Sequence, residues 1–415
     1  MEDVIYERCA GIDVHKRMIM VCLRIGRKTE VREFGTFTYE LREMAKWLKD
    51  NKCEMAAMES TGSYWKPLYN IFELEGIPAM IVNAQHMKAV PGRKTDVKDA
   101  VWIAKLLSQG LLKPSFIPDR ELRELREITR FRKSQIEERA RNLNRLQKML
   151  EGANIKLSGL VSDIGGKYSV KLLELVMGEE VLTVEAVAKY KHHNMKADAD
   201  DLLRSLTGIV SPLQKELFKT VIDIIREQTT QIERIEELIQ RTLSLTYHSA
   251  AVMLQAIPGI GKISAEQIIA EIGIDMSRFP TAAHLCNWAG ICPGNNISAG
   301  KRKSSRTNFA NKTLKSALVQ CAQSAKHNKN SFFYAQYQRL VVRRGKNKAT
   351  VAVAHSLLIA IYHVLSGKEF NDLGSDYYTQ FNKEKKINSH FKQLEKLGVH
   401  LSDDVRKAVV AKAVS

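Results

Sequence analysis

The segment Cys9-Ala10-Gly11-Ile12-Asp13-Val14-His15 decides the fold of the first part of the chain. Its interior is apolar apart from one aspartate, and it leads through a turn at Lys16 and Arg17 into a second apolar segment, residues 18–23. Two such segments separated by a tight turn predict a β-hairpin. A carboxylate inside an apolar strand is costly to desolvate unless it pairs or binds a cation. Asp13 is therefore either a satisfied polar residue of the strand or a candidate ligand.

The hairpin opens a region, residues 8–116, in which strands and helices alternate. The expected elements after it are a helix at 39–51, a strand at 53–58, a helix at 65–74, a strand at 78–82 and a helix at 96–107. Alternation of this kind predicts an α/β sheet domain.

Four carboxylates fall within or at the ends of these elements. Glu59 follows the strand at 53–58, and Asp96 and Asp99 share one face at a helix start because they are three residues apart. Taken alone, Asp96 has a simpler explanation as an N-terminal helix acid, which the helix dipole favours. Taken together with Asp13, the four acids resemble a site for a hard cation such as Mg²⁺, and paired metals suit phosphodiester chemistry.

The middle of the chain, residues 117–250, contains two long amphipathic helical patterns at 119–150 and 215–243. Neither helix can cover its apolar stripe alone. They therefore predict an antiparallel or intermolecular coiled coil, or else an intramolecular helical bundle. Residues 251–367 are expected to form a third, mostly helical domain, and residues 368–415 a polar tail.

The charge of the chain is concentrated in its second half. The formal net charge is +18, and the 93 residues from Met276 to Lys368 contain 15 Lys or Arg and no Asp or Glu. Such a surface attracts polyanions, of which nucleic acid is the commonest. Anionic membranes attract basic proteins too, but we find no uninterrupted apolar run long enough for a spanning helix. Residues 1–4 lack a signal-peptide pattern, so a cytoplasmic, nucleoid-associated protein without a membrane partner is expected.

The six cysteines contain no C-x-x-C pair. Zinc and disulfide interpretations are therefore weak, and buried reduced thiols are the simpler expectation.

Two segments are candidates for phosphate contacts. The stretch 257–264 places a Gly-x-Gly turn before a helix, as in helix–hairpin–helix modules, where backbone amides contact a phosphate. It could equally be a tight helix connection. The basic stretch 91–95 directly precedes the paired aspartates and could hold a phosphate or be a solvated loop. The candidate residues are Gly259, Gly261 and Lys262 in the first segment and Arg93 and Lys94 in the second.

Residues 293–307 are expected to form a hydroxyl-rich loop between basic residues, with Ser298 as a candidate nucleophile. Ser298 precedes Ala299 and Gly300, small residues that allow a phosphate to approach closely. A serine hydroxyl needs its proton removed or its transition state stabilised. Charge on a transferring phosphoryl group could be stabilised by Lys301, Arg302, Lys303 and Arg306. Ser304 and Ser305 are competitors, and a solvent-exposed or capping serine is the plain alternative.

Together these residues resemble the DEDD transposases of bacterial insertion sequences, which have a RuvC-like N-terminal domain and a serine-bearing C-terminal transposase domain. The resemblance covers roughly residues 8–367. The matching motifs lie at 11–16, 58–62 and 91–100 in the first half, and at 258–261, 279–280, 288–290 and 293–301 in the second.

The resemblance implies a fold and a mechanism. It implies an RNase H-like N-terminal domain in which Asp13, Glu59, Asp96 and Asp99 hold Mg²⁺, and a nucleophilic Ser298 that forms a covalent phosphoserine link to DNA. It also implies a composite site assembled between subunits of a dimer or tetramer. A structured guide RNA from the element would pair with donor and target DNA.

Two other functions stay open from the sequence. A metal-dependent RuvC-like junction endonuclease would use the carboxylates to cut DNA by hydrolysis, and Ser298 would be idle. A non-catalytic basic nucleic-acid-binding protein would use its hairpin module alone, and its acids would be structural.

Overall fold

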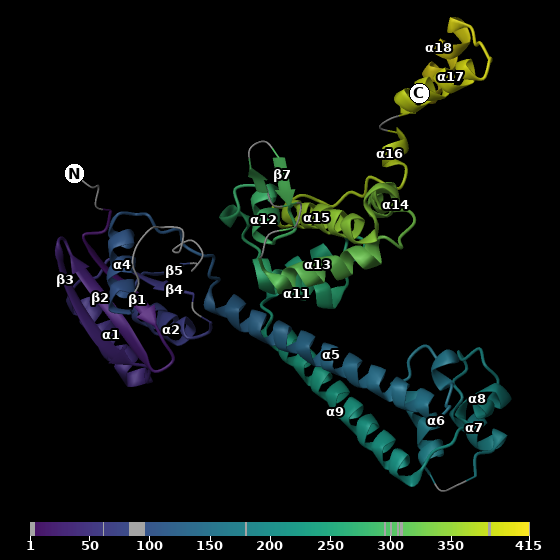
Figure 1. Ribbon diagram of the computed structural model, residues 1–415, viewed down its shortest axis with the longest axis horizontal. Helices are drawn as coiled ribbons and strands as arrows, with labels where there is room; N and C mark the ends of the chain where they lie inside the picture. The colour runs from purple at the N-terminus through teal and green to yellow at the C-terminus, as the bar shows by residue number, and fades with distance from the viewer. Residues whose placement is uncertain are drawn as a thin grey trace. The chain divides into compact units, whose positions relative to one another are not determined.

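The computed structural model describes residues 5–60, 62–82, 96–178, 181–293, 296–298, 301–304, 307, 310–380 and 383–414. The chain forms two compact units, Met1–Pro118 and Asp119–Ser415. The first is an α/β unit and the second is largely helical (Figure 1). The predicted α/β class of the N-terminal part and the helical class of the remainder are therefore confirmed.

The first unit contains one five-stranded sheet, in the order β3-β2-β1-β4-β5. Strands β1, β2 and β3 form an antiparallel meander, and β4 and β5 run parallel to β1. The strands are β1 (Arg8–Val14), β2 (Met18–Ile25), β3 (Lys28–Gly35), β4 (Met55–Glu59) and β5 (Ala79–Val82). The predicted hairpin and the next two strands are present, and β3 is an additional edge strand.

Helices cover both faces of this sheet. The side chains of Ile12 and Met58 pack with Leu41 of α1 (Thr38–Asp50) and Leu68 of α2 (Trp65–Glu75). On the other face, Ala57 packs beneath α4 (Asp96–Ser108). Side chains of a strand alternate between faces, so neighbouring residues of β1 and β4 serve different cores.

The second unit begins with two long helices that pair within the chain, α5 (Arg120–Gly152) and α9 (Pro212–Thr242) (Figure 1). They are antiparallel: Leu125 near the start of α5 shares a core with Ile239 near the end of α9. At the other end of the pair, Leu150 shares a core with Phe218. This second core also contains residues of α6 (Lys167–Met177), α7 (Val184–Tyr190) and α8 (Ala199–Leu206). The apolar stripes of both helices thus find intrachain partners.

The remainder of the second unit is a helical domain and a helical tail. The domain contains α10 (Leu245–Leu254), α11 (Lys262–Ile272), α12 (Ala282–Trp288), α13 (Lys312–Ala325), α14 (Phe332–Arg344) and α15 (Lys346–Leu365), with short strands β6 (Asn296–Ser298) and β7 (Lys301–Ser304). The tail contains α16 (Tyr377–Gln380), α17 (Lys383–Lys396) and α18 (Asp403–Val414). These elements agree with the mostly helical class expected for residues 251–367.

Helix α15 is the most apolar of the long helices in the described part of the second unit. By length and composition it is apolar enough to cross a membrane, the one such helix among the described residues. Its inner face is nevertheless part of the protein core: Val353, Leu357 and Ile361 are completely buried and pack with α10 to α14. A helix that packs in a protein core can have the same length and apolar composition as a membrane-spanning helix, because most of its residues are apolar.

Candidate catalytic carboxylates and serine hairpin

Asp13 and Glu59 lie at the same level and on the same face of the sheet. Ile12 of β1 pairs in parallel register with Met58 of β4, so Asp13 and Glu59 are the next residues of the two strands. Ile12 and Met58 face α1 and α2. Because side chains alternate, the two carboxylates face the side that α4 covers.

Helix α4 lies directly on β1 because residue 11 is glycine. A Cβ atom at Gly11 would lie 2.2 Å from the carbonyl oxygen of Ala100 and 2.2 Å from the amide nitrogen of Ala104. Two residues earlier, the thiol of Cys9 donates a hydrogen bond to the carbonyl of Ala104 (3.5 Å). A side chain at position 11 would therefore push the helix away from the sheet.

The direction of α4 brings its first turn to the end of β1 that carries Asp13. The amide of Ile5, before the strand begins, donates to the carbonyl of Ser108 at the end of the helix (2.8 Å). Helix and strand are therefore antiparallel, and the start of α4 lies toward the end of β1. Asp99, which is partly buried, belongs to that first turn, as does Asp96, whose side chain lies outside the described part of the chain.

Asp13 is nearly buried, with 8% of its surface exposed. Its Oδ2 atom lies 2.9 Å from Nε2 of His15, a pairing that the sequence did not reveal. Asp13 is thus a satisfied strand residue in one sense, because a histidine partner offsets its desolvation. A carboxylate that has a histidine beside it can still act as an oxygen ligand for a cation.

The donor set suits a divalent metal ion. Within the described residues, no three His, Cys, Asp or Glu side chains are arranged closely enough to share an ion. The carboxylates of Asp13 and Glu59 nevertheless face the same side of the sheet, and the helix start bearing Asp99 lies at that end. Oxygen ligands of this kind are those that hard divalent cations prefer.

Ser298 lies in a β-hairpin of the second unit, where the sequence predicted a loop. Its backbone pairs with that of Lys301, and Ile297 pairs with Arg302. An isolated bridge between Pro293 and Thr307 continues the ladder. The sequence does not predict these strands because they are only three and four residues long and mostly polar. They therefore lack the alternation of apolar and polar residues that indicates a strand. The structure gives backbone positions alone for Ser298, Lys301, Arg302 and Lys303, and Arg93, Lys94, Arg306 and Ser305 lie outside the described residues.

The chain leaves this hairpin through a buried hydrogen-bond network that the sequence did not indicate. Asn311 caps α13 by accepting from the amide of Leu314 (3.0 Å), and its Nδ2 donates to Oε2 of Glu271 (2.6 Å). Glu271 is completely buried, and both of its carboxylate oxygens also accept from Arg130 of α5 (2.7 and 2.8 Å). Glu271 therefore ties the return of the serine hairpin to the long helix.

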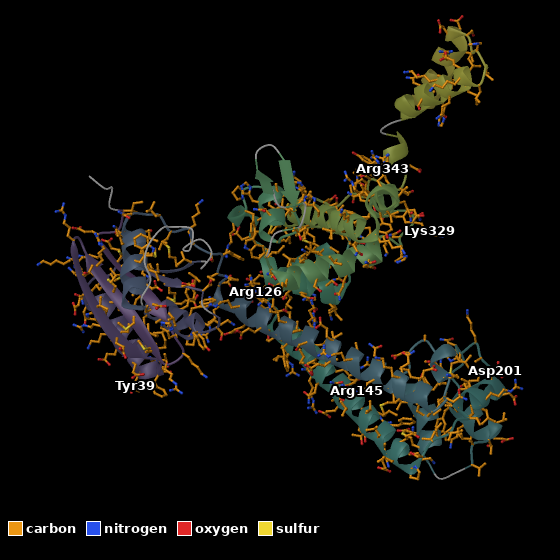
Figure 2. All side chains as sticks on the ribbon, viewed as in Figure 1. Tyr39, Arg126, Arg145, Asp201, Lys329 and Arg343 are labelled. Carbon is orange, nitrogen blue, oxygen red and sulfur yellow. The ribbon has the colours of Figure 1, made fainter. Side chains whose placement is uncertain are left out.

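Further arginines of α5 fasten the same helix, α11. Arg126, labelled in Figure 2, donates to the carbonyl oxygens of Ala270 (3.0 Å) and Glu271 (2.7 Å), and its burial lowers its pKa. Arg132 is buried and donates to Glu266 (2.5 Å). The sequence signal for this network is a pair of glutamates, Glu266 and Glu271, among the apolar residues of helix α11.

The residues of the predicted phosphate-binding hairpin, 257–264, differ in their packing. A Cβ atom at Gly259 (φ +89°) would lie 2.5 Å from the carbonyl oxygen of Cys321, so packing against α13 explains this glycine. Gly261 and Lys262 are exposed at the start of α11, which has no side-chain cap. Packing thus accounts for the absence of a side chain at residue 259, and Gly259, Gly261 and Lys262 stay candidates for a phosphate contact.

The cysteines match the expectation of reduced thiols. All six are free, and four of them are buried. Burial raises the pKa of Cys9 and Cys286 to about 12 and that of Cys22 to about 11. These thiols are protonated at neutral pH and are poor nucleophiles or metal ligands.

Comparison with known proteins gives a match in each half of the chain. A transposase family model, the DEDD transposases of the IS110 type, matches residues 10–155. A second model, described as the transposase IS116/IS110/IS902 family, matches residues 251–338. An uncharacterized 44.8 kDa protein of insertion element IS116 from Streptomyces clavuligerus is 26% identical over 242 residues, which is 52% of this chain and 59% of that protein.

Both matching models describe transposases, the proteins that act in the movement of insertion sequences. Residues 10–155 and 251–338 are thus similar to insertion-sequence transposases of the IS116/IS110/IS902 type, in agreement with the resemblance of the motifs. The DEDD family also suggests that a divalent metal ion is required. The matched segment spans less than two thirds of the IS116 relative.

Proposed function

We propose that this protein is the DNA transposase of an insertion sequence and that it cuts and rejoins DNA through a covalent link to Ser298. The observation that carries this proposal is the arrangement of the first unit, in which Asp13, Glu59 and the first turn of α4 come to one end of one sheet face. The family matches support transposition as the process. The sheet order, with three antiparallel strands followed by two parallel ones, supports an RNase H-like fold.

The four carboxylates Asp13, Glu59, Asp96 and Asp99 would hold Mg²⁺. Bound there, the metal would neutralise charge on the phosphate that reacts. Asp96 and Asp99 lie in the first turn of α4, where the positive end of the helix dipole is favourable for negatively charged groups. Asp13 is desolvated between the sheet and α4, so its position is fixed before a ligand arrives.

Ser298 would supply the nucleophile. Its Oγ atom forms a bond to phosphorus, one P–O bond of the DNA backbone breaks, and the departing sugar oxygen is released as a hydroxyl. The serine proton passes to a carboxylate or to water. Because the phosphoester is conserved, attack by a sugar hydroxyl on the phosphoserine rejoins DNA without a separate energy source. The neighbouring Lys301, Arg302, Lys303 and Arg306 would stabilise the phosphoryl charge.

The partners we propose are donor DNA, target DNA and a structured RNA encoded by the element. The basic region supplies affinity for phosphates, whereas base pairing with the RNA would select the sequence. Arg93, Lys94, Gly261 and Lys262 are further candidates for backbone contacts. A composite site would need a dimer or tetramer, acting at DNA in the cytoplasm.

The covalent link is the step to test. Purified protein with Mg²⁺, labelled donor and target DNA and RNA from the flanks of the element should yield a DNA–protein adduct on a denaturing gel. Ser298→Ala should abolish the adduct, and Ser304→Ala and Ser305→Ala, as matched hydroxyl controls, should retain it. Peptide mapping of the adduct should place the phosphate on residue 298.

Other products would point to the alternatives. Free cleaved DNA, undiminished in Ser298→Ala, would identify a hydrolytic nuclease and contradict the serine mechanism. Binding without any cleavage, unaffected by Asp13→Ala, would identify a non-catalytic nucleic-acid-binding protein.

A further inference from the structure

The corner between α14 and α15 presents an uninterrupted run of exposed residues, 342–348. A single residue, Gly345, separates the two helices. Four of the seven residues are cations: Arg343, Arg344, Lys346 and Lys348. Arg343 is labelled in Figure 2. We call this segment the basic corner.

The cations of the basic corner have no counter-charge. Among the described residues, none of the four side chains has an ion pair or hydrogen-bond partner. The absence of acids from residues 276–368 removes local carboxylates as well. This differs from Arg126, Arg130 and Arg132 of α5, which bind glutamates or backbone carbonyls of α11. Folding therefore leaves the positive potential of the corner available to a ligand.

The arrangement is unfavourable for the isolated protein. Arg343 and Arg344 suit the C-terminal end of α14, but Lys346 and Lys348 lie in the first turn of α15, where the helix dipole disfavours cations. The N-cap of α15 is Gly345, which offers no side-chain acceptor for the first amides of the helix. Four cations within six residues also repel one another. A polyanion would relieve all three effects at once.

We propose that the basic corner binds the sugar–phosphate backbone of a DNA duplex. Two arginine forks and two ammonium groups, together with the free amides of the first turn of α15, match successive phosphate oxygens. The segment contains no aromatic side chain for base stacking, so it would position a duplex without reading its sequence. This inference rests on the proposed function, because it names a second contact for the same substrate apart from the serine hairpin.

The salt dependence of binding tests the basic corner quantitatively. The test variant is Arg343→Gln/Arg344→Gln/Lys346→Gln/Lys348→Gln, and affinity for a labelled DNA duplex is measured by anisotropy over a series of salt concentrations. Each lost phosphate contact should reduce the slope of log K against log salt by about 0.9, so the slope should fall by up to about 3.6. A charge-conserving variant, Lys346→Arg/Lys348→Arg, should keep the original slope.

A matched control removes the same number of charges elsewhere in the second unit. Its four positions are exposed cations outside residues 276–368 and without an ion pair among the described residues: Lys148, Lys196, Lys219 and Arg234. Replacing them by Gln should leave the slope for duplex DNA nearly unchanged. Thermal unfolding of both variants should match the wild type, because all eight side chains are exposed.

The proposal would be overturned if the slope of log K against log salt for duplex DNA were the same in the test and control variants. It would also be overturned if the test variant lost affinity for a labelled RNA stem–loop but not for duplex DNA. The adduct assay on wild-type protein separates this proposal from the proposed function. If duplex binding depends on the corner but no adduct forms, the function fails and the contact stands. If the adduct forms and the corner variant binds DNA normally, the contact alone fails.

Discussion

Individual residues decide how closely the elements of the candidate site approach. The sequence predicts that Gly11 belongs to a strand. Its role in allowing the close approach of α4 to β1 follows only from the packing of that helix on the sheet. The ion pair of Asp13 with His15 is similarly local and could be predicted from neither residue alone. A role of the carboxylates as ligands for a hard cation could be proposed from their types and their positions at strand ends, and it stays a prediction. The placement of Asp13, Glu59 and the start of α4 at one end of a sheet face could not be predicted, because it depends on the register of β1 with β4 and on the direction of α4.

Replacing Gly11 by alanine should destabilise the first unit. The added methyl group would meet backbone atoms of α4 that cannot rotate away, and overpacking of a core costs roughly 1–3 kcal/mol. Thermal or denaturant unfolding should detect the loss. Gly152→Ala is the matched control, because a Cβ atom there meets nothing within 4 Å, and its unfolding should be unchanged or slightly improved.

The buried thiols predict a loss of stability in alkali. The pKa values of Cys9 and Cys286 are about 12 in the folded protein and that of Cys22 is about 11, against 9.0 for an ordinary thiol. Their contribution is complete below pH 9 and declines as the pH rises toward the folded pKa, because the unfolded chain ionises first. Denaturant midpoints measured from pH 8 upward should fall more steeply for the wild type than for a Cys9→Ala/Cys22→Ala variant. Parallel curves would contradict this assignment.

Elements with strong periodicity could be predicted from the sequence, and those without it could not. Helices α5, α9 and α15 carry sustained apolar stripes, so their existence and approximate ends were readable. Strand β3 was missed because it is an exposed edge strand whose sequence is dominated by charge. The intrachain pairing of α5 with α9 could not be chosen over an intermolecular coiled coil, because the same stripes satisfy both. The hydrogen-bond network of Glu271 joins three segments that are distant in the sequence: α5, α11 and the start of α13. The sequence therefore indicates it only through acidic residues at buried positions of α11.

Glu271→Ala should disturb the second unit strongly. The substitution leaves the largely buried Arg126 without the carboxylate 3.5 Å away and Asn311 without an acceptor, and removing one partner of a buried ion pair costs about 3–5 kcal/mol. Unfolding in denaturant should show this loss. The exposed glutamate of the Arg241–Glu237 pair on α9 provides the comparison, since Glu237→Ala should cost about 0–1 kcal/mol. A similar small cost for both substitutions would show that the network does not hold α5 to α11.

At the scale of the whole molecule, the candidate chemistry is divided between two compact units. The carboxylates belong to Met1–Pro118 and the serine hairpin to Asp119–Ser415. The two family matches follow the same division, one in each half of the chain. Composition alone indicated a nucleic-acid partner, and the motifs indicated the family. Cooperation of the two units in one reaction is the central claim that follows from this organisation.

The most direct test of that claim is the yield of the DNA–protein adduct for Asp13→Asn. This substitution keeps the size of the side chain and removes the charge that would hold a metal ion. Asp50→Asn, at the surface end of α1, is the matched control. We expect Asp13→Asn to lose the adduct although Ser298 is intact, and the control to form it at the wild-type level. Adduct formation by Asp13→Asn at the wild-type level would contradict a role for the carboxylates of the first unit in the reaction of the serine.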